Sequence, residues 1–131
     1  MLKTGILNPN LLELLGRFRH TNTIVIADRG FPSWPQVPTI DLSLTDGIPT
    51  VRQVLEAILP ACRVGGAFMA AECKKSNPAQ TVQLAVNLLK AHDAAIRFEA
   101  HAKFKTRVPG CIGLIRTADT MPYANIILES A

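Results

Sequence analysis

Hydrophobic residues recur along the chain at two different spacings, in alternating segments. Helical spacing predicts helices over about 9–19 and 51–59, a long helix from about 78 through Leu89 with His92 in its last turn, and a shorter helix over 101–106. Short apolar or alternating runs predict strands over 23–27, 40–44, 64–71, 95–99, 111–116 and 124–128. Thr50 is expected to cap the second helix. Strands that alternate with helices predict a three-layer α/β/α sandwich around a central, largely parallel sheet.

One segment is expected to be irregular and to lie beside a ligand site. The stretch 31–38 contains three prolines and follows the strand predicted over 23–27. Ligands of such sheets bind at the carboxyl ends of the strands. Asp28 closes that strand and is followed by Gly30, which places its carboxylate in the expected crevice. The alternative role for Asp28 is turn formation or helix capping.

Composition narrows the class of protein. The chain has 131 residues, 48% hydrophobic and 18% charged, so we expect one domain over 1–131 with a packed core. Its net charge is +4, but the basic residues are scattered and only 5% of residues are aromatic, which argues against nucleic-acid binding. No apolar run is long enough for a bilayer span, and the first residues show no secretory pattern. Cys62, Cys73 and Cys111 have no metal-ligand spacing, and reduced thiols are typical of the cytoplasm.

Several side chains could carry chemistry, although each has a plain alternative. His20 lies between the first helix and the first strand, where a histidine often serves as a helix C-terminal cation. His101 and Lys105 would share one helix face, and without further information the pattern indicates an ordinary solvent-exposed face. Tyr123 is the only tyrosine and could be a core or rim aromatic. We interpret His92, in the last turn of a helix, as structural.

The order of short motifs over the whole chain resembles the D-ribose pyranase and L-fucose mutarotase (RbsD/FucU-like) family. The motifs are Gly5-Ile6-Leu7-Asn8, His20-Thr21-Asn22-Thr23, Ala27-Asp28-Arg29-Gly30-Phe31-Pro32, Glu72-Cys73-Lys74, Asn77-Pro78, His101 with Phe104 and Lys105, and Pro122-Tyr123-Ala124-Asn125-Ile126-Ile127-Leu128. The segment 40–49 is closer to the pyranase branch than to the fucose branch.

The resemblance implies an activity and a set of site residues. His20 falls on the family's catalytic histidine, and the sugar-contacting positions are Asp28, His101, Lys105, Tyr123 and Asn125. The implied reaction interconverts ring forms or anomers of a free monosaccharide through the open-chain aldehyde. A histidine suits it, because the imidazole can take or give a proton near neutral pH. The family uses no metal or organic cofactor. It forms rings, pyranases typically decamers of two pentamers, with sites shared between neighbouring subunits.

Three residues depart from the family pattern in the loop after the first strand. Arg29 stands where pyranases commonly have a small residue, while Phe31 and Trp34 add bulk. We expect these residues to affect which sugar is preferred, and a guanidinium at position 29 would favour an anionic or phosphorylated sugar. The alternative function is a non-catalytic sugar-binding or transport-accessory module with the same fold.

Overall fold

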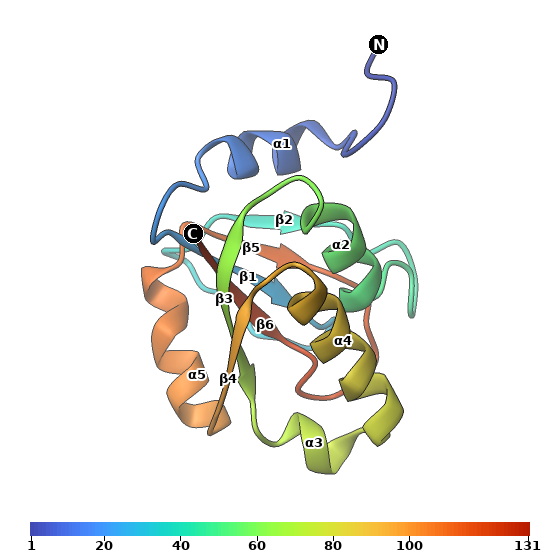
Figure 1. The fold of residues 1–131 in the computed structure, drawn as a ribbon, viewed down its shortest axis with the longest axis vertical. Coiled ribbons are helices and arrows are strands. Elements are labelled where there is room, and N and C mark those ends of the chain that lie inside the picture. Colours follow the sequence, from blue (N-terminus) through green and yellow to red (C-terminus); the bar gives the residue numbers. More distant parts are fainter.

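The computed structural model describes residues 1–131 as a six-stranded sheet with helices on both faces (Figure 1). The strands, in the spatial order β2-β5-β1-β6-β3-β4, are β1 (Thr23–Ala27), β2 (Thr39–Asp41), β3 (Val64–Ala70), β4 (Ala95–Glu99), β5 (Gly113–Arg116) and β6 (Ile126–Ser130). The helices are α1 (Pro9–Gly16), α2 (Val51–Ile58), α3 (Cys73–Ser76), α4 (Ala79–Ala91) and α5 (His101–Arg107), and a 3₁₀ turn covers Val108–Gly110. No helix combines the length and the apolar character that a membrane span requires.

The direction of the last strand shapes the ligand edge of the sheet. β2, β5 and β1 are parallel neighbours, as are β3 and β4, whereas β6 is antiparallel to both β1 and β3. Ile26 near the end of β1 pairs with Ile126 at the start of β6. The residues that precede β6 therefore meet the residues that follow β1. The sheet is mixed but mostly parallel, as predicted.

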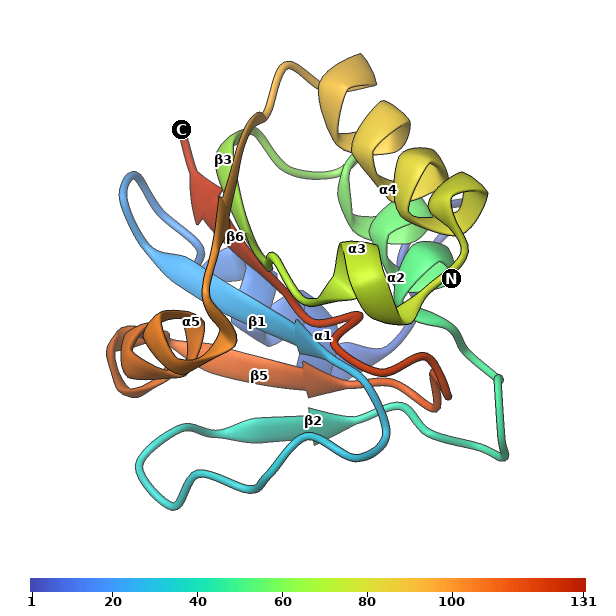
Figure 2. The same cartoon turned by 90° about the horizontal axis from the view of Figure 1, so that it is seen from below.

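Each face of the sheet has its own apolar core. Alternate residues of β1 point to opposite faces, as in any strand. Ile24 and Ile26 pack with the apolar stripes of α1, α2 and α4, and Val25 packs with Phe104 of α5. Figure 2 shows α5 on one side of the sheet and α2 and α4 on the other. This arrangement is the three-layer sandwich expected from the alternation of elements.

The observed elements differ from the predicted ones in three places. α1 ends at Gly16 instead of about residue 19, and the Arg17 and Phe18 N–H groups donate to carbonyls three residues back in a tight final turn. The predicted strand 40–44 is only three residues long, since the Asp41 carboxylate accepts the Ser43 N–H and turns the chain. α3 was not predicted. The cap on α2 is confirmed, and Thr50 forms a full capping box there.

Candidate functional site

A cavity of about 340 Å³ opens at the carboxyl end of β1. Its walls are the segment after β1, the segment before β6 and the first residue of α5. A volume of this size suits a small ligand. The lining residues are Asp28, Arg29, Gly30, Phe31, Pro32, His101, Asp119, Thr120, Met121, Pro122, Tyr123 and Asn125.

Asp28 and Asn125 form a reciprocal pair across the floor of the cavity. The Asp28 N–H donates to Asn125 Oδ1 at 2.7 Å, and Asn125 Nδ2 donates to Asp28 Oδ2 at 3.0 Å. The Gly30 N–H donates to the other carboxylate oxygen at 2.9 Å. Burial raises the pKa of Asp28 above its ordinary value, although the hydrogen bonds from Gly30 and Asn125 act in the opposite direction. The carboxylate is thus fixed in place and partly removed from water.

His101 and Tyr123 form the second polar group of the cavity. Their rings meet edge to face with centroids 5.0 Å apart. The His101 ring also stacks on Phe104, at 6.0 Å and an interplanar angle of 13°. Tyr123 has a φ of +58°, a left-handed conformation that is costly for a tyrosine and is often found at functional sites.

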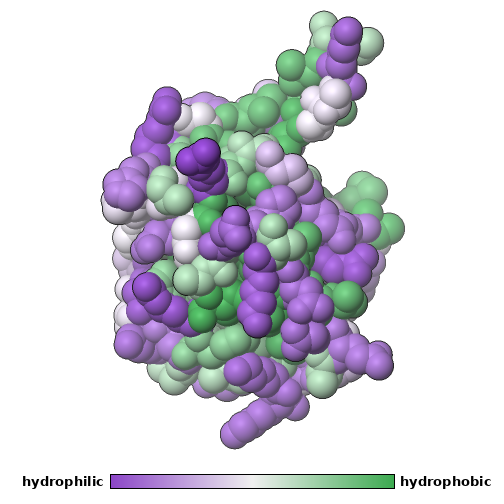
Figure 3. Space-filling model, viewed as in Figure 1, coloured by the Kyte–Doolittle hydropathy of each residue, from purple (hydrophilic) through white to green (hydrophobic).

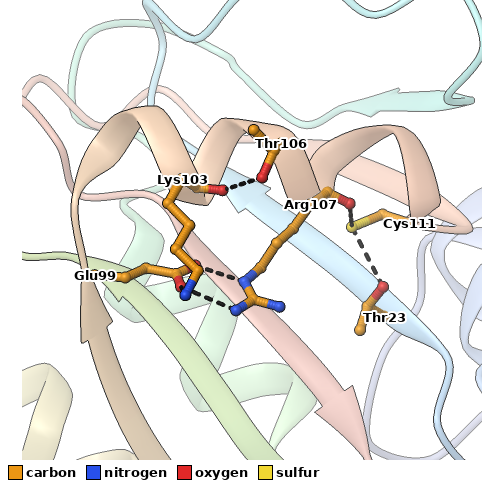
Figure 4. Close-up of polar contacts among 6 residues, drawn as sticks. All are labelled: Thr23, Glu99, Lys103, Thr106, Arg107 and Cys111. Atoms are coloured by element: carbon orange, nitrogen blue, oxygen red, sulfur yellow. Dashed lines mark hydrogen bonds and ion pairs between the residues drawn. The ribbon is translucent and has the colours of Figure 1, made fainter.

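Carboxylates from neighbouring segments hold both ends of α5. At its start the Glu72 carboxylate accepts the His101 N–H at 2.9 and 3.1 Å, and this hydrogen bond lowers the pKa of Glu72. At its end Arg107 donates two hydrogen bonds to Glu99 of β4, as Figure 4 shows. The Arg107 guanidinium also lies 3.9 Å from the centre of the Phe68 ring. These contacts fix the helix that presents His101 to the cavity.

The loop after β1 brings two of its three expected specificity residues to the cavity. Arg29 lines the cavity, but its guanidinium pairs with Asp46 of the turn after β2. Phe31 lines the cavity too, and Arg116 donates a hydrogen bond to its carbonyl at 2.6 Å. Trp34 does not reach the cavity. It packs against Phe31, with ring centroids 6.5 Å apart, so its influence on a ligand would pass through that ring.

Lys105 and His20 do not line the cavity within one chain. Lys105 lies one turn after His101 on α5 and is partly exposed. His20 is exposed and precedes β1, whereas Asp28 follows the same strand. The five residues of β1 span about 16 Å, at roughly 3.3 Å per residue. His20 and Asp28 therefore lie at opposite edges of the sheet.

The cavity also contains residues that the sequence analysis missed, from Asp119 to Pro122. Asp119 follows β5, as Asp28 follows β1, so the rule that singled out Asp28 could have found it. The structure contains no group of three or more histidine, cysteine, aspartate or glutamate side chains arranged to hold a metal ion.

Comparison with known proteins assigns the chain to a family. Residues 1–131 match the RbsD / FucU transport protein family. The D-ribose pyranases of Streptococcus agalactiae serotype V and Chromobacterium violaceum are 38% and 39% identical, over 99% of this chain and 97% of theirs. The solved structure of Bacillus subtilis RbsD complexed with D-ribose superimposes with a TM-score of 0.93, at 36% identity, over 100% of this chain and 98% of that one. The protein therefore belongs to the RbsD/FucU family.

Proposed function

We propose that this protein is a cytoplasmic sugar isomerase that interconverts the ring forms or anomers of a free aldose. The observation that carries the proposal is the fixed Asp28–Asn125 pair beside His101 and Tyr123 in a cavity of about 340 Å³. Family membership supports it, since similar relatives are named D-ribose pyranase, an isomerase. The complex of Bacillus subtilis RbsD with D-ribose makes D-ribose the first substrate to test.

The reaction needs two proton transfers and no redox step. The anomeric hydroxyl loses a proton while the ring oxygen gains one, and the bond between the anomeric carbon and the ring oxygen breaks to give the open-chain aldehyde. Closure through a different hydroxyl, or on the other face of the aldehyde, completes the conversion. A general acid–base group performs both transfers. We assign this role to His20, with Asp28 as the acceptor that orients a sugar hydroxyl.

Because His20 lies at the opposite edge of the sheet from Asp28, we propose that a second copy of the chain supplies it, within a pentamer or decamer. Exposed apolar residues support self-association: Leu44 is 79% and Ile48 52% exposed. They flank Asp46, which pairs with Arg29 at the cavity, so a copy that covers them would lie against the cavity rim. The N-terminal segment, with Leu2 and Leu7 exposed, projects from the body in Figure 3.

The charges around the cavity favour a neutral sugar over an anionic one. The only guanidinium in the lining, that of Arg29, is paired with Asp46, while Asp28 and Asp119 bring carboxylates to the walls. An unpaired phosphate would face these carboxylates and be repelled. Lys105 has a flexible stem whose ammonium could reach a hydroxyl at the rim from the next turn of α5.

Saturation-transfer NMR with catalytic amounts of protein tests the proposal directly. We expect faster exchange between the ring-form or anomer signals of D-ribose, or of another free pentose or deoxyhexose, than in buffer alone. Folded protein that accelerates no sugar in a broad panel would rule out the enzyme. Chemical-shift changes on titration with the same sugars would then favour the non-catalytic binding module.

A further inference from the structure

Asp119 is the only charged side chain among the buried residues, with 6% of its surface exposed. It takes part in none of the ion pairs of the structure. A carboxylate without a cationic partner is costly to bury unless hydrogen-bond donors compensate for the lost water. The position of Asp119 in the cavity wall therefore needs an explanation from its contacts.

These contacts join three segments around the cavity. Oδ2 accepts the Val51 N–H at 2.9 Å, from the first residue of α2, and Oδ1 accepts the Met121 N–H at 2.9 Å. The backbone carbonyl of Asp119 accepts the Arg29 N–H at 3.1 Å. Hydrogen bonds to an ionised acceptor are shorter and stronger than neutral ones, so the carboxylate is a firm anchor for both N–H groups.

Capping of α2 does not account for the residue. Thr50 already caps this helix: its hydroxyl accepts the Gln53 N–H at 3.1 Å, and the Gln53 side chain accepts the Thr50 N–H at 2.9 Å. The bond from Val51 to Asp119 is additional to this capping box. It ties the helix to the cavity wall.

We propose that Asp119 is a positioning residue of the sugar site, which holds the wall carrying Asp28 and the wall carrying Tyr123 at a fixed separation. The proposal rests on the function proposed above. The Asp119 carbonyl fixes Arg29, the residue after Asp28, and its carboxylate fixes Met121, two residues before Tyr123. Tyr123 is held in a left-handed conformation that needs such support.

The charge of Asp119 gives the proposal a second readout. Its negative charge is among the causes that raise the pKa of Asp28, after the larger effect of burial. Removal of that charge should lower the pKa of Asp28. The acid limb of the pH–rate profile should then move to lower pH, which loss of stability alone would not cause.

The test compares Asp119→Asn with Thr50→Ala in the full chain. The asparagine keeps the shape of the side chain, but its amide nitrogen cannot accept an N–H, so one of the two anchors is lost. Thr50→Ala weakens the same end of α2 without touching the cavity wall. Tyr123 is the only tyrosine, so ¹³C-labelled tyrosine gives a single NMR reporter of the wall, whether or not the protein is active.

In Asp119→Asn we expect the tyrosine signal to shift or broaden in the sugar-free protein, kcat to fall about 10- to 100-fold, and the acid limb to move to lower pH. In Thr50→Ala we expect all three to stay near wild type. The proposal is wrong if the two variants behave alike or if Asp119→Asn leaves the tyrosine signal unchanged. If Asp119→Asn does not fold, Asp119→Ser, which is smaller and places no amide NH₂ group opposite the backbone N–H groups, should give the same three changes. A moved tyrosine signal in a protein without sugar isomerase activity would leave the anchoring intact and overturn the proposed function alone.

Discussion

The assignment of His20 to a neighbouring subunit predicts that two inactive variants restore activity when they share an oligomer. His20→Ala removes the acid–base group, and Asp28→Asn removes the carboxylate at the other edge of the sheet. The two side chains are separated by β1, about 16 Å of extended chain, so one subunit cannot bring them together. His20→Ala should lose about 10²–10⁴-fold in rate, the usual contribution of a positioned acid–base group, and Asp28→Asn about 100-fold, from loss of the group that positions the sugar.

The expected recovery follows from how a ring is assembled. In a head-to-tail ring each site takes one wall from one subunit and His20 from the next. When the two variants are co-expressed in equal amounts, a site regains both groups only if its wall comes from a His20→Ala chain and its histidine from an Asp28→Asn chain. Random mixing gives this combination in about a quarter of the sites. Ring-form exchange by NMR should therefore recover to about a quarter of the wild-type rate per site.

Two controls make this outcome decisive. His92→Ala changes a histidine at the end of α4, far from the cavity lining, and should behave like wild type in every assay. Separately assembled variants, mixed without subunit exchange, should stay inactive. A His20→Ala protein with near-normal exchange would contradict the role of His20 and leave His101 as the leading acid–base candidate. Two inactive variants with no recovery in mixed oligomers would contradict the shared site.

Three further outcomes follow from the structure. Gly113→Ala would place a Cβ 2.6 Å from Cδ1 of Leu14 and should lower the free energy of unfolding by about 1–3 kcal/mol in urea titrations. The control is Gly16→Ala, whose Cβ would have no atom within 4 Å and should not destabilise the protein. The hydrogen bond from Arg107 lowers the pKa of Glu99 in the folded protein. The pair therefore stabilises the fold above the ordinary glutamate pKa of about 4.3, and this stabilisation is lost as the pH falls through the lower pKa of the folded state. Glu99→Gln should therefore unfold more easily than wild type at neutral pH, and equal denaturation midpoints there would refute the contribution. Because burial raises the pKa of Asp28, ring-form exchange in the wild-type protein should start to fall at a higher pH than an exposed aspartate would give. An acid limb at the pH expected of an exposed aspartate would contradict this.

Local sequence signals predicted most helices and strands, because these elements depend on residues that are close together in the sequence. The β-branched run 23–27 is a buried strand, and Thr50 followed by Gln53 forms the predicted helix start. The shortened strand β2 shows the limit of pattern reading, because the N–H and the hydroxyl of Ser43 both donate to the Asp41 carboxylate and the chain turns there.

The set of residues that line the cavity was less predictable, because the direction of a strand in the sheet depends on partners that are distant in the sequence. Nothing in the apolar run before Ser130 shows that β6 runs against its neighbours, yet this reversal brings Asn125 to Asp28. Asp119 follows β5 as Asp28 follows β1, so its place beside the cavity was predictable, but its partners on α2 and on the loop after β1 are distant in sequence and were not. The resemblance to known proteins identified Asn125, which residue patterns alone did not.

The central place of β6 also determines when the protein can fold during its synthesis. β6 is the last strand along the sequence, yet it lies between β1 and β3 in the sheet. Until residues 126–130 have left the ribosome, β1 and β3 have no strand between them, and each keeps an unpaired edge open to other chains. Pairing between residues about 100 positions apart is slow to find, which lengthens the exposed period. Chaperone protection is therefore most needed just before the final strand emerges.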